Sequence, residues 1–160
     1  MESQAEKQEI ILKNYSEMIY RLALSLLKNR SDAEDVFQEV FLRLVKKNPV
    51  FESEEHCRAW LIRVTVNCCK NVRRCAWFRR TVPLEDAPVF DTPEEADVCS
   101  AVFELPPKYR VVIHLYYYQD MPVKQISDAL HLKESTVTSQ LCRARAMLKQ
   151  KLKGEFGDEN

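Results

Sequence analysis

PVKQISDALHLKESTVTSQLCRARAMLKQKL, residues 122–152, is the stretch that decides the fold. Its first half repeats apolar side chains at the three-and-four spacing of one helical face, from Val123 to Leu130. Residues 131–133 interrupt this repeat. A second apolar stripe then advances in steps of four, three and four residues, at Val137, Leu141, Ala144 and Leu148. The stretch therefore predicts two helices joined by a tight turn.

The second of these helices has a polar face opposite its apolar stripe, formed by Ser135, Thr136, Ser139 and Arg143. Residues 122–153 carry seven cations against two carboxylates, a local charge of +5 that would attract duplex DNA. A helix-turn-helix places its second helix in the major groove, so residues 133–140 would face the base edges. The alternative is an amphipathic helical hairpin whose charged side is only solvated.

Composition favours an all-α protein. The 160 residues include only two glycines, and no sustained alternation of apolar and polar residues predicts a strand. The N-terminal MESQAEKQEI lacks a signal-peptide pattern, and no apolar run approaches the ~20 residues of a membrane span, so we expect a cytoplasmic protein. The six cysteines show no CxxC spacing and no histidine cluster. We therefore expect reduced thiols at mostly buried positions, with neither a metal nor a cofactor.

Charge is strongly segregated along a chain whose net charge is zero. Residues 56–80 hold seven cations and no acid, whereas residues 81–104 hold seven acids and no cation. Such blocks predict separate surfaces for separate partners.

The first half predicts three helices. Apolar spacing indicates one over residues 10–27, and the capping-box sequence Ser31-Asp32-Ala33-Glu34 predicts that a second begins there. The second helix leaves Asp35, Gln38, Glu39, Leu42 and Arg43 towards solvent, with Phe41 at the border. This outer face is either simply solvated or a docking patch.

A third helix is expected over residues 57–76. Its predicted inward residues are Cys57, Trp60, Leu61, Val64, Cys68 and Val72. At about 100° per residue, four further residues lie within roughly 60° of one another and well away from the apolar face, and they form a basic stripe. Its members are Arg63, Asn67, Lys70 and Arg74. Such a stripe suits a nucleic-acid backbone.

Residues 81–91 contain two prolines and several acids without periodicity, which predicts an extended linker. Thr92-Pro93-Glu94-Glu95 then predicts a new helix start, and Leu105-Pro106-Pro107 ends that helix and begins another that runs to about Tyr118. We therefore expect two small helical domains, residues 1–80 and 93–160, joined by an acidic linker at 81–92. The second is the helix-turn-helix domain.

These segments together resemble the extracytoplasmic-function sigma factors, small members of the sigma-70 family that give bacterial RNA polymerase its promoter specificity. In the first half the resemblance rests on SDAEDVFQEVFLR (31–43) and AWLIRVTVNCCKNVRR (59–74). In the second it rests on LPPKYRVVIHLYYYQDMPVKQISDAL (105–130) and STVTSQLCRARAML (135–148). It covers nearly the whole chain and implies a factor without chemistry of its own that binds core RNA polymerase and directs transcription initiation.

The resemblance assigns roles to residues that match the family's segments. Docking on a coiled coil of the polymerase's largest subunit falls to Asp35, Gln38, Glu39 and Phe41. Contacts with the melted minus-ten element fall to Arg63, Asn67, Lys70, Arg73 and Arg74. Contacts with the minus-35 element fall to Lys133, Ser135, Thr136, Thr138, Ser139, Gln140 and Arg143. The implied partners are core polymerase, promoter DNA and an anti-sigma factor, which can be membrane-anchored; no small-molecule substrate is implied.

The chain departs from the family's pattern at the turn and on the reading face. His131 stands where Gly is common, Lys133 where Ser is the usual cap, and Thr138 and Gln140 where relatives often have basic residues. A helix-turn-helix regulator that acts without polymerase is the main alternative, but it would need neither the acidic-amide face nor the basic stripe. An enzyme is disfavoured because the three histidines lack catalytic or metal-site spacings and no Gly-rich phosphate loop is present.

Overall fold

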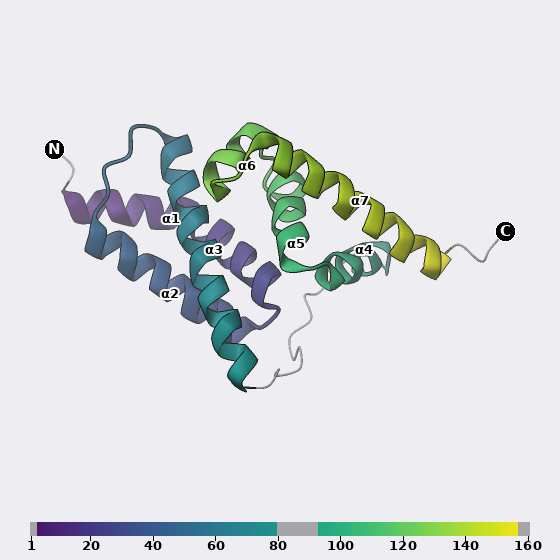
Figure 1. The fold of residues 1–160 in the computed structure, drawn as a ribbon. Coiled ribbons are helices and arrows are strands. Elements are labelled where there is room, and N and C mark those ends of the chain that lie inside the picture. The colour runs from purple at the N-terminus through teal and green to yellow at the C-terminus, as the bar shows by residue number, and fades with distance from the viewer. Residues whose placement is uncertain (1–2, 80–92, 157–160) are drawn as a thin grey trace. The chain divides into compact units, whose positions relative to one another are not determined.

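The computed structural model describes the backbone of residues 3–79 and 93–156 and most side chains within those ranges (Figure 1). Every regular element in the described ranges is a helix, as composition predicted. The chain divides into two compact units, Met1–Glu85 and Asp86–Asn160. The expected linker at 81–92, with the Thr92 cap, lies outside the described residues.

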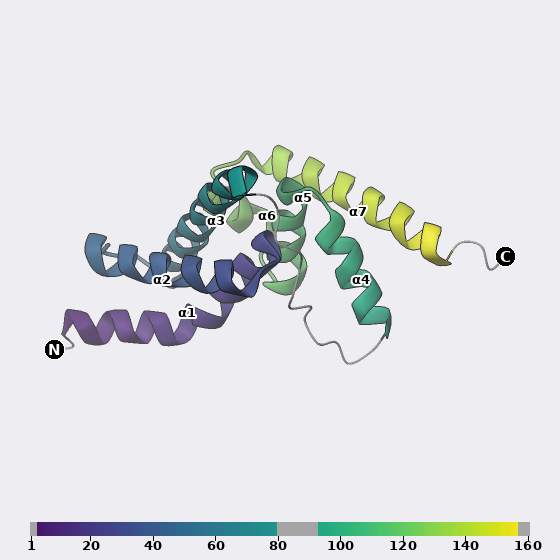
Figure 2. The same cartoon turned by 90° about the horizontal axis from the view of Figure 1, so that it is seen from below.

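Unit 1 consists of α1 (Gln4–Leu27), α2 (Arg30–Lys47) and α3 (Glu54–Arg79). Each of these helices packs against the other two, and Figures 1 and 2 show α3 crossing the α1–α2 pair. Helix α1 begins six residues earlier than the periodicity predicted. A capping box explains this start: the Glu6 N–H donates to Ser3 Oγ at 3.3 Å, and the Ser3 N–H donates to Glu6 Oε2 at 2.9 Å.

The capping box predicted at Ser31–Glu34 is wrong. Helix α2 begins at Arg30, and its cap is Asn29, whose side-chain oxygen accepts from the Asp32 N–H at 3.0 Å. The connection is short because Lys28 closes α1 in the left-handed conformation, with φ of 59°, directly before this cap. The chain therefore re-enters helix before Ser31 can act as a cap.

The buried face of α3 is centred differently from the prediction. Trp60 and Val64 are only half-buried. The residues at the centre of the buried face are Leu61, Ile62, Thr65 and Cys69. Cys57, Leu61 and Cys68 are buried as predicted, but the buried face extends further to one side, so its centre is shifted by roughly 75° because α3 packs against both α1 and α2. The buried Thr65 hydroxyl donates to the Leu61 carbonyl at 2.7 Å, so it has a partner inside the core.

Unit 2 contains α4 (Pro93–Glu104), α5 (Pro107–Ile113), the π-helix η1 (His114–Tyr118), α6 (Val123–Leu130) and α7 (Glu134–Phe156). Pro93 opens α4, as predicted. The helix expected through Tyr118 changes from α to π geometry at His114, where the Gln119 N–H donates to the His114 carbonyl at 3.2 Å. Helices α4, α5 and α6 each pack against α7.

The core of unit 2 combines the two predicted apolar stripes with α5 and η1. Its fully buried residues include Val112, Leu115, Ile126, Ala129, Val137 and Ala144. Arg110 is buried beside this core, and its Nη1 donates to the carbonyls of Phe103 and Leu105, each at 2.9 Å. This buried cation supplies a hydrogen-bond donor to carbonyls at the end of α4 and so joins α4 to α5.

The turn between α6 and α7 has the predicted position. His131 adopts the left-handed conformation with φ of 54°, as expected for the residue that replaces Gly. The Leu132 N–H donates to the Ser127 carbonyl at 3.1 Å, a Schellman bond, and the Ser127 hydroxyl donates to the Leu132 carbonyl. Lys133 precedes α7 and accepts the Val137 N–H through its backbone at 3.1 Å, but its side chain has no acceptor with which to cap the helix.

Candidate nucleic-acid interface

The polar face of α7 is open to solvent over most of the predicted residues. Lys133, Ser135, Thr138, Ser139 and Arg143 are exposed, and Thr136 is half-buried. The Thr138 hydroxyl donates to the Glu134 carbonyl at 3.0 Å, so its proton is already used within the helix. Small hydroxyl side chains with one long cation let a helix approach base edges closely.

Gln140 and Cys142 differ from what the sequence suggested. Gln140 lies about 70° from the centre of the buried stripe and is half-buried. Its Oε1 is covered and has no hydrogen-bond partner among the described residues. Cys142 is exposed, nearer the centre of the outward face. Sequence reasoning missed the exposure of Cys142 because cysteine usually packs as a small apolar residue. Its angular position on the helix, away from the apolar stripe, was the signal that could have predicted this exposure.

Three tyrosines from the preceding helices contact the two arginines of α7. The Arg145 Nε donates to the Tyr117 hydroxyl at 2.6 Å, and the guanidinium lies 5.4 Å from the Tyr116 ring centroid. Arg143 donates to the hydroxyl of Tyr109 and thereby lowers the pKa of that tyrosine. Sequence pattern gave no sign of these contacts because the tyrosines are distant in the chain.

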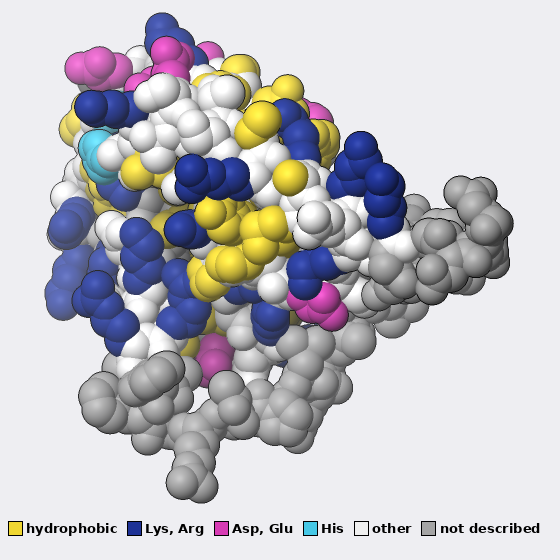
Figure 3. Space-filling view, turned by 45° about the vertical axis from the view of Figure 1, so that its right-hand side comes forward, with side chains coloured by type: hydrophobic (Ala, Val, Ile, Leu, Met, Phe, Trp, Pro, Cys, Tyr) yellow, Lys and Arg dark blue, Asp and Glu magenta, His cyan; other side chains and the backbone are white. Residues whose placement is uncertain are grey.

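The basic stripe of α3 is mostly solvent-accessible. Asn67, Lys70 and Arg74 are exposed and Arg63 is half-buried. With the buried face rotated, these four residues lie almost opposite it. Figure 3 shows dark-blue Lys and Arg side chains gathered on this side of unit 1, at the left of the view.

Arg73, assigned to the same surface by resemblance, lies at the border of the buried face. It is half-buried, and its Nη1 is covered and has no hydrogen-bond partner among the described residues. Burial lowers the pKa of Arg73, and the neighbouring Cys69 acts in the opposite direction. Arg73 is therefore less available to a ligand than Lys70 or Arg74.

The outer face of α2 combines acids, an amide and apolar side chains. Asp35, Gln38 and Glu39 are exposed, Phe41 is half-buried, and Arg43 Nε lies 3.1 Å from Glu39 Oε1. Leu42 and Val45 are 57% and 45% exposed. Exposed apolar groups beside polar ones are typical of a protein-docking surface.

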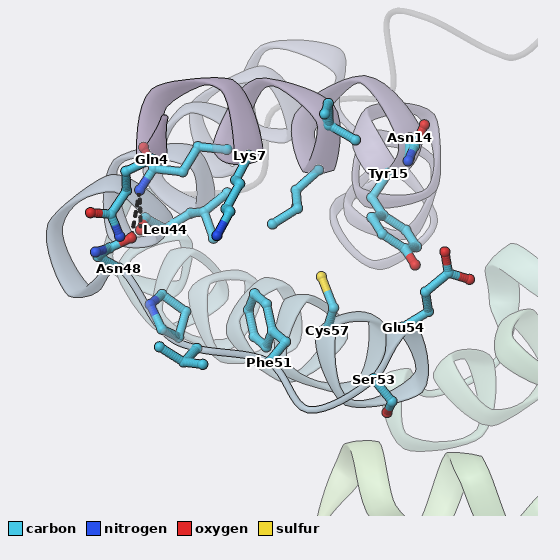
Figure 4. A pocket seen from close by; sticks show the side chains of 15 residues that line it. Gln4, Lys7, Asn14, Tyr15, Leu44, Asn48, Phe51, Ser53, Glu54 and Cys57 are labelled. Carbon is cyan, nitrogen blue, oxygen red and sulfur yellow. Dashed lines mark hydrogen bonds between the residues drawn. The ribbon is translucent and has the colours of Figure 1, made fainter. Parts of the chain in front are cut away.

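A hollow of about 410 Å³ in unit 1 is bounded by α1, the end of α2, residues 48–53 and the first turn of α3 (Figure 4). The Gln8 amide donates to the Asn48 side chain at 3.1 Å, which holds one end of this loop. At the other end, the Phe51 ring packs edge-on against His56 and Trp60. The loop between α2 and α3 is thus held on both sides of the hollow.

The described cysteines are free thiols, as expected. Cys57, Cys68 and Cys69 are buried and Cys142 is exposed. Burial, with a smaller contribution from Glu54, raises the pKa of Cys57 to about 11, and burial raises the pKa of Cys69 to about 12. Within the described ranges, no group of three or more His, Cys, Asp or Glu side chains could hold a metal ion, and no helix is long and apolar enough to cross a membrane.

Comparison with known families gives two matches, one in each unit. The family described as Sigma-70 region 2 matches residues 11–79, and the family described as Sigma-70, region 4 matches residues 100–148. The first match spans all of α2 and α3, and the second spans α5, α6 and the first part of α7.

Individual proteins give the same result. The chain is 33% identical over 138 residues to the ECF RNA polymerase sigma factor SigL of Mycobacterium tuberculosis, covering 79% of this chain and 78% of that protein. It is 30% identical over 155 residues to SigE of Mycolicibacterium smegmatis, covering 89% of this chain and 60% of SigE. Its fold is similar to that of the sigma factor RpoE from Bartonella quintana, solved with the anti-sigma factor NepR. For RpoE the TM-score is 0.75 at 22% identity, covering 94% of this chain and 98% of that one.

Proposed function

This chain belongs to the extracytoplasmic-function sigma factors of the sigma-70 family, and we propose that three of its helices divide the work of promoter recognition. Helix α2 binds core RNA polymerase, α3 binds the opened minus-ten element and α7 binds the minus-35 element. In domain terms, residues 1–80 form the region 2 domain, 81–92 the linker and 93–160 the region 4 domain. The protein acts in the cytoplasm and has no catalytic activity of its own.

Polymerase docking is supported by the composition and exposure of α2. The surface offers carboxylates and an amide at Asp35, Gln38 and Glu39, with Phe41 partly accessible beside them. The exposed Leu42 adds apolar area at the same place. A DNA-binding regulator that acts alone would have no use for such a face.

Minus-ten binding is supported by the shape and charge of α3. Lys70 and Arg74 project from the side opposite the buried face, with Asn67 beside them and Arg63 a turn earlier. An exposed row of cations follows a sugar-phosphate backbone without needing a groove. Arg73 belongs to this surface as a partly buried member.

Minus-35 binding is supported by α7 and its turn. Ser135, Ser139 and Arg143 are exposed on the side of α7 opposite Val137 and Leu141, which lie in the core. That is the arrangement a helix needs to lie in the major groove, with base contacts from its exposed side chains. Lys133, Thr136, Thr138 and Gln140 complete the proposed surface.

An anti-sigma factor, anchored in a membrane or free, is a further proposed partner. Support comes from RpoE of Bartonella quintana, which has this fold and was solved in complex with the anti-sigma factor NepR.

The observation that carries the proposal is the presence of three chemically distinct exposed faces on three helices of one chain. A direct test is Gln38→Ala with Glu39→Ala, assayed for binding to core polymerase. Both side chains are exposed, so helix content should stay unchanged while affinity falls about tenfold or more, as for loss of a strong interface contact.

The matched control is Glu17→Ala. Glu17 is exposed on α1 and pairs with Arg21 at 2.6 Å, just as Glu39 pairs with the arginine four residues later. Unchanged polymerase affinity in the double variant, or an equal loss in the control, would remove α2 as the docking helix.

A further inference from the structure

The hollow in unit 1 has opposite charges at its two ends and apolar groups between them. Lys7 of α1 lines one end, and Figure 4 shows Glu54 of α3 at the other end, beside Tyr15. Phe51 and Cys57 lie between the two charged groups in the same view. The lining therefore suits a molecule with an apolar body and a charge of each sign at its ends.

The length of the hollow follows from α1. Lys7 and Tyr15 are eight residues apart, about 12 Å along the helix at 1.5 Å per residue. Tyr15 marks the Glu54 end: burial raises the pKa of this tyrosine most, and the nearby Cys57 and Glu54 raise it further. Three extended peptide residues span about 10–11 Å. A ligand that joins the two charged ends is therefore about as long as a tripeptide.

Neither charged group is engaged by another side chain of opposite charge. Over residues 3–79, the ion pairs seen are those of Arg21 and Arg43 with glutamates of their own helices, at 2.6 and 3.1 Å, and none involves Lys7 or Glu54. Both side chains belong to exposed residues. They are thus available to the charges of a ligand.

The polar lining matches the backbone of a peptide. Four side-chain amides line the hollow, at Gln4, Gln8, Asn14 and Asn48. An amide both donates and accepts hydrogen bonds, as a peptide group does. Ile10 and Val50 also line the hollow and are 46% and 87% exposed, so they offer apolar area to an entering side chain. The volume, about 410 Å³, lies within the roughly 300–1,000 Å³ of typical small-ligand sites.

We propose that this hollow binds a free peptide of about three residues. Its terminal carboxylate pairs with Lys7, its terminal ammonium pairs with Glu54, and an apolar side chain lies against Phe51. This inference goes beyond the proposed promoter functions, since binding requires neither DNA nor polymerase. A bound peptide holds residues 48–53, which join α2 to α3, against α1.

The test is binding of the tripeptide Ala-Leu-Ala to the full chain, measured by calorimetry and by fluorescence. In a Trp77→Phe variant Trp60 is the only tryptophan. Its ring lies 5.8 Å from the Phe51 ring, centroid to centroid, so occupation of the hollow should change its emission. Ala-Ser-Ala, which lacks the apolar side chain, should bind about tenfold more weakly.

Charge variants and blocked peptides identify the two ends. Lys7→Gln should weaken Ala-Leu-Ala binding about threefold to fivefold, as for an exposed ion pair, and should not change the affinity of the C-amidated peptide. Glu54→Gln should have the same effect on the free peptide and none on the N-acetylated one. The controls Lys13→Gln and Glu9→Gln alter exposed residues of α1 outside the hollow and should bind as the wild type does.

Four results would overturn the peptide site. One is the absence of saturable binding of Ala-Leu-Ala. Another is equal affinity for a peptide blocked at both ends, which would mean that a segment within a longer protein is the occupant. The third is a penalty for blocking that persists in Lys7→Gln and Glu54→Gln, which would place the peptide elsewhere on the chain. The fourth is displacement of the peptide by single-stranded minus-ten DNA, which would assign the hollow to the proposed promoter surface.

Discussion

Helices α3 and α7 both present cations to solvent, but they do so in different ways. The stripe on α3 consists of long side chains, Lys70 and Arg74 above all, with a single amide among them. Over its first two turns α7 exposes mainly short side chains, chiefly Ser135 and Ser139, and Arg143 further along is held by a tyrosine from another helix.

The difference bears on what each helix can approach. Long cationic side chains reach a flexible strand from a distance and tolerate its changes of shape. Short hydroxyl side chains allow the helix backbone itself to enter a groove, where a fixed arginine can set the register. Charge alone therefore does not distinguish the two proposed DNA surfaces, whereas side-chain length does.

The largest expected effect concerns the α3 stripe. Lys70→Ala with Arg74→Ala removes two charge-assisted contacts, each worth about 1.5–3 kcal/mol, so formation of the open complex should fall at least about 100-fold. A template with a mismatched bubble at the minus-ten element should recover part of the lost transcription. Lys13→Ala with Arg21→Ala, two exposed cations on α1, is the control.

A smaller effect is expected on α7, and it should not depend on strand opening. Gln140→Ala should reduce discrimination at one upstream base pair by about 1–3 kcal/mol, equally on duplex and bubble templates. Gln150→Ala, an exposed glutamine further along the same helix, should leave discrimination unchanged. If the bubble rescued the Gln140 and Lys70/Arg74 variants alike, the division between the two helices would be wrong.

The structure sharpens the Gln140 test. Because its Oε1 is covered and lacks a partner, Gln140 must rotate outward to reach a base. Gln140→Met would remove an unsatisfied buried oxygen and should raise the urea midpoint of unfolding. Retained base preference in Gln140→Met would show that this side chain packs and does not read DNA.

The last expected effect is the response of stability to alkaline pH. Cys57 and Cys69 have folded-state pKa values of about 11 and about 12, above the ordinary thiol value of 9.0, so the unfolded chain releases these protons first. The free energy of unfolding should therefore be fully present below pH 9 and fall as pH rises from 9 towards 11 and 12. In unit 2 the pKa of Tyr109 is lowered in the folded state, so ionisation of this tyrosine raises the free energy of unfolding as pH approaches 10.

Urea unfolding at a series of pH values checks this expectation. Cys69→Ala should flatten the alkaline decline, whereas Cys142→Ala, which removes an exposed thiol, should not. A decline that is unchanged in Cys69→Ala would mean that other groups cause it.

Most of the fold could be predicted from local pattern. The apolar stripe at Val137, Leu141 and Ala144 is buried as the spacing indicated, Pro93 opens α4, and His131 takes the left-handed turn. These features depend on a few neighbouring residues, and helical periodicity reports them directly. Helix starts were less predictable, since Asn29 rather than Ser31 caps α2.

The candidate site was only partly predictable. Exposure of Ser135, Ser139, Lys70 and Arg74 follows from the same periodicity. The half-buried positions of Arg73 and Gln140 do not, because a border residue's exposure depends on which neighbouring helix covers it. The match of both halves to the sigma-70 family came from local segments that the chain itself displays.

Sequence by itself thus determined the helices, the turn between α6 and α7, the segregation of charge and the family. Each of these depends only on residues that lie close together in the chain. Tertiary structure alone decided the rotation of α3, since that helix packs against two others at once. It also decided that Lys108 and Arg143 share Tyr109, because only the packing of α5 on α7 brings side chains so distant in the chain within contact.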